Sequence, residues 1–218
     1  MTDADAPAPR VLGRTGHAVA AVWREQADGS ITAGVSPDSP FTGLVVDASE
    51  LDRRGGDRVR GRVATHGRPF DFLIARGLLA NDLKVGWPLH RLQRLRDEKL
   101  FRYVVIETSD ALEAEWISAN APVHGVVIAY DSTDMAARYR VFDAAANAGV
   151  ALIGHATTTA AAALQLATPR LTATLLPATI SVPAALPTEA ADALWSTYSA
   201  AHPEPQKLRG AHPPDFGT

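Results

Sequence analysis

The sequence predicts an α/β protein folded as a (β/α) TIM-type barrel, and three observations support this fold class. Apolar, β-prone runs alternate with helical patterns along most of the chain. Several of these runs end on ionisable residues, as strands do at the mouth of such a barrel. With 46% hydrophobic and 21% charged residues, the composition is that of a globular protein with a full core.

The stretch Trp87–Asp110 carries the clearest pattern. Its leucines recur near helical spacing over Leu89–Lys99, which predicts an amphipathic helix. A β-prone strand over Tyr103–Thr108 follows and reaches the ionisable residue Glu107 near its end. A helix that leads into a buried strand with polar residues at its exit is the repeating unit of a parallel α/β fold.

The other elements follow the same alternation, after a short N-terminal hairpin of Arg10–Leu12 and His17–Val19. The remaining predicted strands are Ala18–Trp23, Leu44–Ala48, Phe70–Ala75, Gly125–Tyr130, Val150–Gly154 and Leu171–Leu176. The remaining predicted helices are Ala111–Ser118, Asp134–Ala148, Thr157–Ala167 and Glu189–Ala201. No Gly-rich dinucleotide turn or P-loop follows any strand, so the runs favour a closed or nearly closed barrel over a Rossmann sheet.

Length and composition bound the organisation of the chain. We expect one barrel domain over 10–203 in the 218 residues, between a disordered tail at 1–9 and an extended tail at 204–218. The chain has no cysteine, which excludes a disulfide framework, a thiolate nucleophile and a Cys-based zinc site. Its seven histidines are scattered without a ligand motif, so we predict no metal.

The charge pattern excludes two classes of partner. A net charge of −3 gives no reason to expect nucleic acid, and the arginines of 53–62 alternate with acidic residues as on a solvated helix face. No apolar run is long enough for a membrane span, and the acidic, Pro/Ala-rich start does not resemble a signal peptide. We therefore expect a cytoplasmic protein with a small-molecule substrate, no nucleic-acid partner and no membrane partner.

The order of these segments resembles that of the aldo/keto reductases. RVLGRTGHAV at 10–19 is similar to the family's opening hairpin, and LVVDASELDRRGGDRVRGRVA at 44–64 to its second strand and helix. HGVVIAYD at 124–131 resembles the sixth strand, and NAGVALIGH at 147–155 the approach to the seventh. The resemblance implies a shortened barrel that lacks one β/α unit, since only 52–69 separates the second strand from the next.

The catalytic residues that the resemblance implies are mostly absent. The family uses an Asp, a Tyr, a Lys and a His at the barrel mouth, together with NADPH. Asp47 matches the Asp, but Asp52 stands where the Tyr belongs and Arg76 where a Lys or His would stand. Carbonyl reduction needs a proton donor of suitable pKa beside the hydride source, and neither Asp52 nor its neighbour Leu51 replaces a phenol.

The cofactor pattern is also incomplete. Ser109-Asp110 is only half of the Ser-Asn pair that the family places near the nicotinamide, and Val127 stands where a Gln is expected. The segment LPATISVPAALP lacks the basic, Ser-rich loop that would hold phosphates. We therefore expect no cofactor, with NADPH as the alternative.

Ionisable residues at the strand exits form the candidate site. The predicted catalytic residues are His155, Asp47, Tyr130, Arg76 and Glu107. The predicted substrate contacts are Trp23, Arg24, Asp131 and Ser109. In this hypothesis a His or carboxylate moves a proton, Tyr130 donates or orients, and Arg76 holds an anionic oxygen. Other interpretations stay open: Asp47 as a helix cap, Arg76 as an ion-pair partner of Asp47 or Glu107, and Tyr130 as a core ring.

The sequence thus favours an enzyme that has left reduction. We expect cofactor-independent acid/base chemistry of the lyase or isomerase type on a small carbonyl-bearing metabolite, in the manner of a biosynthetic tailoring enzyme. The alternatives are a divergent NADPH-dependent oxidoreductase and a non-catalytic pseudoenzyme that binds a ligand or partner. A shortened barrel could leave a strand edge exposed, and a homodimer would cover it.

Overall fold

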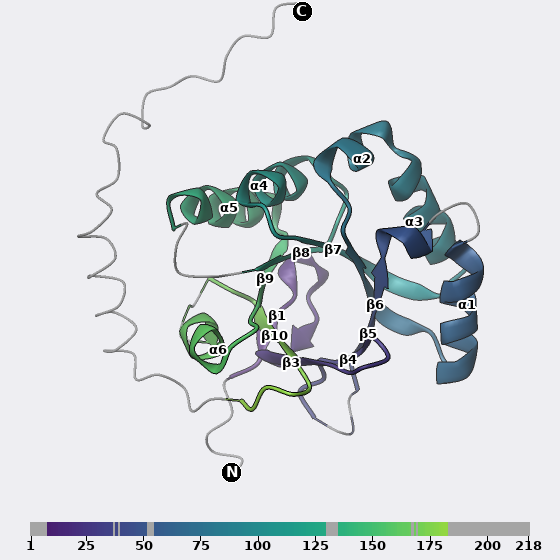
Figure 1. Ribbon diagram of the computed structural model, residues 1–218, viewed down its shortest axis with the longest axis horizontal. Coiled ribbons are helices and arrows are strands. Elements are labelled where there is room, and N and C mark those ends of the chain that lie inside the picture. Colours follow the sequence, from purple (N-terminus) through teal and green to yellow (C-terminus); the bar gives the residue numbers. More distant parts are fainter. Residues whose placement is uncertain are drawn as a thin grey trace, which may run out of the picture.

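A closed ring of eight strands forms the centre of the molecule (Figure 1). The computed structural model describes residues 8–36, 38, 40–51, 55–129, 135–166, 168 and 170–182. Around the ring the strands follow the order β10-β3-β4-β5-β6-β7-β8-β9. Their bounds are Val22–Glu25 (β3), Ser30–Thr32 (β4), Thr42–Asp47 (β5), Phe70–Arg76 (β6), Phe101–Thr108 (β7), Gly125–Ala129 (β8), Ala151–His155 (β9) and Ala173–Pro177 (β10). The predicted barrel is confirmed.

One strand of the ring, β4, differs from the others. It is antiparallel to both β3 and β5, whereas every other neighbouring pair in the ring is parallel. A hairpin turn joins β3 to β4 directly, so β4 has no helix of its own, and the ring keeps eight strands. The predicted loss of a β/α unit concerns a different place, 52–69, where the helix Gly55–His66 lies. Since the ring is closed, it offers no exposed strand edge to a partner. The homodimer stays a prediction, but an exposed edge no longer argues for it.

Helices cover the outside of the ring, and most lie where the sequence predicts them. Their bounds are Gly55–His66 (α1), Ala80–Val85 (α2), Trp87–Asp97 (α3), Ala111–Asn120 (α4), Met135–Ala148 (α5) and Thr159–Leu166 (α6), with a 3-10 turn at Ala48–Leu51 (η3). The short α2 was not predicted. The predicted helix Glu189–Ala201 lies outside the described residues, as do both predicted tails apart from Ala8 and Pro9.

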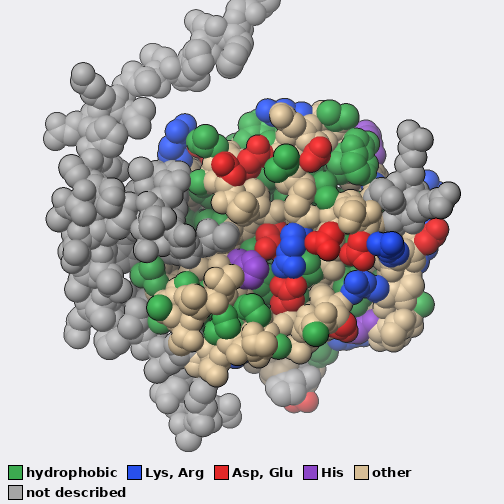
Figure 2. Space-filling view, viewed as in Figure 1, with side chains coloured by type: hydrophobic (Ala, Val, Ile, Leu, Met, Phe, Trp, Pro, Cys, Tyr) green, Lys and Arg blue, Asp and Glu red, His purple; other side chains and the backbone are tan. Residues whose placement is uncertain are grey.

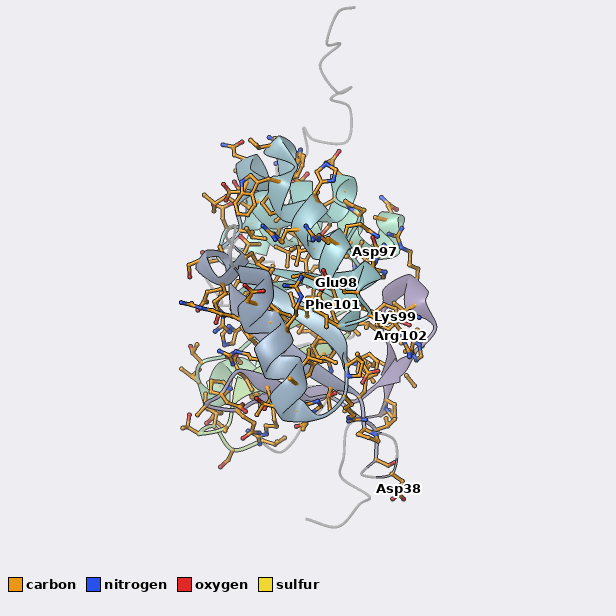
Figure 3. All side chains as sticks on the ribbon, turned by 90° about the vertical axis from the view of Figure 1, so that its right-hand side faces the viewer. Asp38, Asp97, Glu98, Lys99, Phe101 and Arg102 are labelled. Atoms are coloured by element: carbon orange, nitrogen blue, oxygen red, sulfur yellow. The ribbon has the colours of Figure 1, made fainter. Side chains whose placement is uncertain are left out.

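Neighbouring units of the ring are joined on the outside by charged side chains as well as by apolar packing. Figure 3 shows the turn between α3 and β7 beside α1. Here Glu98 accepts hydrogen bonds from Nε and Nη2 of Arg60, both at 2.7 Å. Lys99 follows with a φ of 60°, the left-handed conformation that reverses the chain into β7.

Large apolar side chains fill the inside of the ring. Trp23 and Phe72 lie 4.6 Å apart between ring centroids, and Phe41 stacks on Phe72 at 5.4 Å. Space for the Phe72 ring comes from Gly43 on the neighbouring strand, because a Cβ there would overlap that ring. The interior is therefore a packed core rather than a channel.

The N-terminal hairpin closes the ring at the amino ends of the strands. Arg10–Val11 (β1) pairs with Ala18–Val19 (β2), and the buried Leu12 and Val19 join the interior core. The backbone N–H of Arg14 donates to the carbonyl of Gly149 at 2.8 Å. The predicted hairpin is thus confirmed, and it leaves the opposite end of the ring as the mouth.

Replacing Gly13 with alanine is expected to loosen this hairpin and lower the free energy of unfolding by about 2 kcal/mol. Gly13 has a φ of 48°, and a Cβ there would lie 2.6 Å from the carbonyl oxygen of Gly149. That neighbour is backbone and cannot rotate away. Urea unfolding measures the loss. A Gly16 to alanine change is the control, since Gly16 also has a positive φ but no atom within 4 Å of such a Cβ; equal losses for the two variants would contradict the close-contact argument.

Candidate active site at the barrel mouth

Strand alternation places one layer of charged side chains above the apolar interior. Because side chains two residues apart share a face of a strand, the residue two positions beyond an inward apolar residue also points inward. Five strands each have an inward apolar residue followed two positions later by an ionisable residue at the mouth. These pairs are Trp23 and Glu25 on β3, Val45 and Asp47 on β5, Ile74 and Arg76 on β6, Val105 and Glu107 on β7, and Ile153 and His155 on β9. Five strand exits thus converge on one mouth.

Four of these side chains form a continuous chain of hydrogen bonds. Arg76 donates from Nη2 and Nη1 to the two oxygens of Glu25, at 2.8 and 3.2 Å, and from Nε to Oε2 of Glu107 at 2.7 Å. The other oxygen of Glu107 lies 2.9 Å from Nδ1 of His155. Figure 2 shows acidic, basic and His side chains side by side in the middle of the face seen down the barrel. The chain runs from β3 across the mouth to β9.

Burial and hydrogen bonding set the protonation state of Glu107. Burial disfavours its charged form, but the hydrogen bonds from His155 and Arg76 outweigh this, and the pKa of Glu107 is lowered. The pKa of Arg76 is raised, because the hydrogen bonds to Glu25 and Glu107 outweigh the opposing effect of its burial. At neutral pH the pair is therefore a carboxylate and a guanidinium.

An ionised Glu107 fixes the tautomer of His155. A carboxylate can only accept, so the shared proton belongs to Nδ1 of His155, an assignment made from the hydrogen bond. The other ring nitrogen, Nε2, then carries a lone pair when the imidazole is neutral. The His155 side chain is 17% exposed, so it is held by the protein and still reaches solvent. This is the arrangement of a general base with a carboxylate behind it.

The backbone at His155 is fixed as well. Gln165 on α6 donates from Nε2 to the His155 carbonyl at 3.2 Å. Its side chain packs on Gly154, where a Cβ would overlap the Gln165 amide. Gly154 therefore lets α6 approach β9 closely and hold the strand end that carries His155.

The structure assigns different surroundings to the other predicted catalytic residues. Arg76 forms ion pairs with Glu25 and Glu107, which supports the interpretation of Arg76 as an ion-pair partner of Glu107. The nitrogen atoms of its guanidinium that make these pairs are not free to bind the predicted substrate oxygen. Asp47 is exposed at the rim, and its backbone N–H donates to Glu50 at 3.1 Å. Tyr130 lies outside the described residues.

The structure does not bring the four predicted substrate contacts together at the mouth. Trp23 has no exposed surface and donates from Nε1 to the Ala20 carbonyl at 3.0 Å, so it supports the floor of the mouth from below. Arg24 bonds the carbonyls of Pro177 and Ile180 after β10 and braces that loop. Ser109 is exposed beyond β7, while Asp131 lies outside the described residues.

Glu25 is the one residue of the hydrogen-bonded chain that was not among the predicted site residues. The predicted first barrel strand, Ala18–Trp23, ends two residues before it, whereas β3 runs to Glu25. Its position two residues beyond the inward Trp23 is a signal that the sequence did contain, once β3 is extended to Glu25.

Comparison with solved structures decides the fold. Aldo-keto reductase AKR11C1 from Bacillus halodurans, in its holo form, is 11% identical over 87% of this chain and 95% of its own, with a TM-score of 0.59. A thermostable aldo-keto reductase in complex with epalrestat is 14% identical over 86% and 98%, with a TM-score of 0.64. The chain has the aldo/keto-reductase fold. A Pseudomonas aeruginosa protein assigned to the aldo-keto reductases is 13% identical over 91% of this chain and 99% of its own, with a TM-score of 0.57.

Sequence comparison adds nothing to this. No known sequence family and no curated protein matches the chain. At 11–14% identity the solved structures establish the aldo/keto-reductase fold, and the reaction must be argued from the residues at the mouth.

Two positions that the family resemblance places near a nicotinamide hold side chains with other surroundings here. Asp110 turns its side chain to the start of α4, where it accepts from the backbone N–H of Glu113 at 2.9 Å as an N-cap. Val127, where the resemblance implies a Gln, is fully buried in the barrel interior. Val127 therefore has no polar group for the amide of a nicotinamide, and one carboxylate oxygen of Asp110 is already used by the helix start.

Two further features are absent from the described residues, a metal-binding cluster and a membrane-spanning helix. In that part of the chain, His, Asp and Glu side chains form no group of three or more suited to a metal ion. None of its helices is long and apolar enough to cross a membrane.

Proposed function

We propose that the barrel mouth catalyses proton transfer on a small carbonyl-bearing molecule, with His155 as the acid/base group and Glu107 as its positioning partner. The observation that carries the proposal is the 2.9 Å contact between Nδ1 of His155 and Oε1 of Glu107, which leaves Nε2 as the free basic atom. No cofactor takes part in this reaction.

The steps follow from the geometry of this pair. Nε2 of His155 takes a proton from the carbon next to the carbonyl, and the carboxylate of Glu107 stabilises the imidazolium that forms. The imidazolium then returns the proton to a different atom of the same molecule, which gives an isomerisation without net change in composition. Arg76 keeps Glu107 ionised and takes no step itself.

The main alternative is a divergent NADPH-dependent oxidoreductase. It is favoured by the fold, because the solved structures of the same fold are reductases and one of them is a holo form. Its test is direct. Titration of the protein with NADPH, followed by nucleotide fluorescence, should show no saturable binding under our proposal. Binding at micromolar concentrations would overturn the cofactor-free reaction.

Replacing His155 with alanine should lower the rate of proton transfer by about 100-fold, the lower end of what a positioned acid/base group contributes. The readout is NMR detection of deuterium incorporation from D2O next to the carbonyl, over a panel of small ketones and aldehydes. A Glu107 to glutamine change should also slow exchange, because a neutral amide no longer stabilises the imidazolium.

The control is a His90 to alanine change, since His90 is an exposed residue of α3 and takes no part in the chain of hydrogen bonds at the mouth. This variant should exchange at the wild-type rate. If the wild-type protein and the His155 variant incorporate deuterium into every compound equally slowly, the proton-transfer proposal is wrong. That result would support the alternative of a non-catalytic binding protein.

A further inference from the structure

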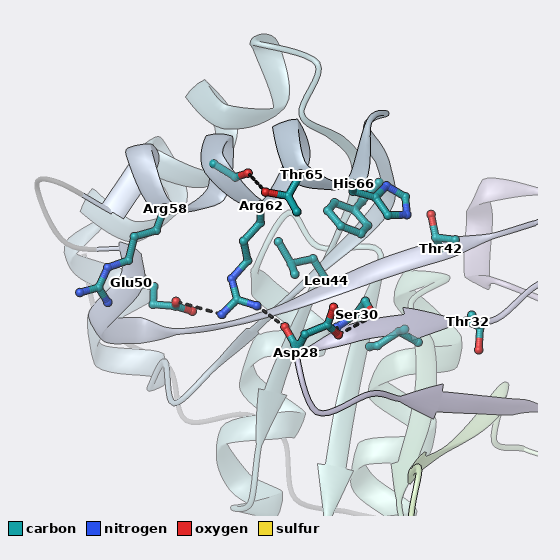
Figure 4. Close-up of a pocket in the computed structure, with 13 residues that line it drawn as sticks. Asp28, Ser30, Thr32, Thr42, Leu44, Glu50, Arg58, Arg62, Thr65 and His66 are labelled. Carbon is teal, nitrogen blue, oxygen red and sulfur yellow. Dashed lines mark hydrogen bonds and ion pairs between the residues drawn. The ribbon is translucent and has the colours of Figure 1, made fainter.

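A groove lies on the outside of the barrel, between α1 and the strands β4 and β5 (Figure 4). It is a groove of about 740 Å³, within the size range of small-molecule sites. Its wall on the helix side carries Arg58, Arg62, Thr65 and His66, and its floor carries Ser30, Thr32, Thr42 and Leu44. The groove exists because β4 has no helix of its own.

The sequence of β4 shows that this outer face is built for polar contact. Ile31 points inward and is 1% exposed, whereas Ser30 and Thr32 on either side of it face the groove. A strand face that a helix covers is normally apolar, as Leu44 and Val46 of β5 are under α1. The outer face of β4, with its two hydroxyls, is therefore not of the apolar kind that packs against a helix.

Charge balance decides between an anionic and a neutral ligand. The groove holds two arginines and two carboxylates, and Arg62 already contacts a Glu50 oxygen at 3.4 Å and the Asp28 carbonyl. Asp28 in turn accepts from the backbone and hydroxyl of Ser30. A site for a phosphate or a nucleic acid would show an excess of positive charge instead.

The opposite end of the groove supplies an aromatic surface. His66 stacks on Phe70 with ring centroids 4.3 Å apart and an interplanar angle of 19°. Phe70 is buried beneath, whereas His66 is exposed, so one face of the imidazole remains accessible. The hydroxyl of Thr42, in the groove floor nearby, is buried with no hydrogen-bond partner among the described residues.

We infer that this groove binds a neutral polyhydroxylated ligand of the sugar class. Such a ligand has many hydroxyls that both donate and accept, which match the Ser, Thr, Arg and carboxylate groups of the walls. Its apolar C–H face can pack on the exposed face of the His66 ring. The site is separate from the mouth and does not depend on the reaction proposed there.

Saturation-transfer NMR with glucose, maltose, ribose and myo-inositol tests the inference, with glucose 6-phosphate as the anionic probe. We expect saturable binding of at least one neutral compound at millimolar concentration. Comparing glucose with maltose separates a free monosaccharide from a longer glycan as the source. Replacing Thr32 with valine and Arg58 with alanine should each weaken that binding by about tenfold, the effect of one lost polar contact.

The matched control is a Thr172 to valine change, which removes a hydroxyl directly before β10, outside the groove. It should leave binding unchanged, as should His155→Ala at the mouth. Thermal unfolding of each variant checks that the barrel is intact. The inference is overturned if none of the neutral compounds binds, if binding survives both groove variants, or if glucose 6-phosphate alone binds.

Discussion

Replacing Gly43 with alanine should destabilise the barrel by about 3 kcal/mol, a large overpacking effect. The reason is that the Cβ of an alanine would overlap the ring of Phe72, which occupies the space above Gly43 inside the closed ring. Phe72 is fully buried against Trp23 and Phe41 and has no room to turn. Urea unfolding followed by tryptophan fluorescence measures the change.

A Gly61 to alanine change is the matched control. Gly61 lies within α1, and no atom stands within 4 Å of a Cβ built there. Alanine should therefore stabilise the helix by about 0.5–1 kcal/mol through its higher helix propensity. The double change of Gly43 to alanine and Phe72 to leucine should recover part of the loss. If Gly43→Ala unfolds at the wild-type urea concentration, the proposed packing of the interior is wrong.

The elements that the sequence predicts well are those with a long periodic pattern. The strand over Phe101–Thr108 and the helix α3 before it are examples, because several residues of each repeat the same period. β4 was missed because Ser30–Thr32 is only three residues long and two of them are polar. α2 was missed for the same reason, since its six residues contain a single buried leucine, Leu83.

The sequence could predict which residues lie at the candidate site, but not which of them form hydrogen bonds with one another. Ionisable residues at strand exits identified His155, Glu107 and Arg76, since parallel strands of a barrel end at one mouth. Which of them touch depends on the register between strands, and sequence periodicity does not contain that register. Only the structure shows Arg76 held between Glu25 and Glu107.

Replacing Arg76 with methionine should lower the free energy of unfolding at neutral pH by about 3 kcal/mol, because it leaves two partly buried carboxylates without their cation. The pH dependence in the acid range should also become weaker. In the wild type the lowered pKa of Glu107 stabilises the fold above its unfolded pKa of about 4.3, and this contribution disappears as the pH falls through the folded pKa. Without Arg76, only the contact with His155 still opposes the effect of burial on Glu107, so the pKa of Glu107 moves up toward its unfolded value and the loss of stability in acid becomes smaller. Urea unfolding of both proteins from about pH 2 to about pH 7 covers the range in which this contribution is lost and measures the two slopes.

An Arg60 to methionine change is the control, because Arg60 also binds a glutamate, Glu98, through two hydrogen bonds of 2.7 Å. That pair lies on the outer surface, where solvent screens it, so its loss should have a far smaller effect on both the free energy of unfolding and the pH slope. The comparison separates the effect of burial from the effect of losing an arginine. If the Arg76 variant keeps the wild-type slope, Glu107 does not depend on Arg76 for its charge, and the proposed role of Arg76 in keeping the partner of His155 ionised is lost.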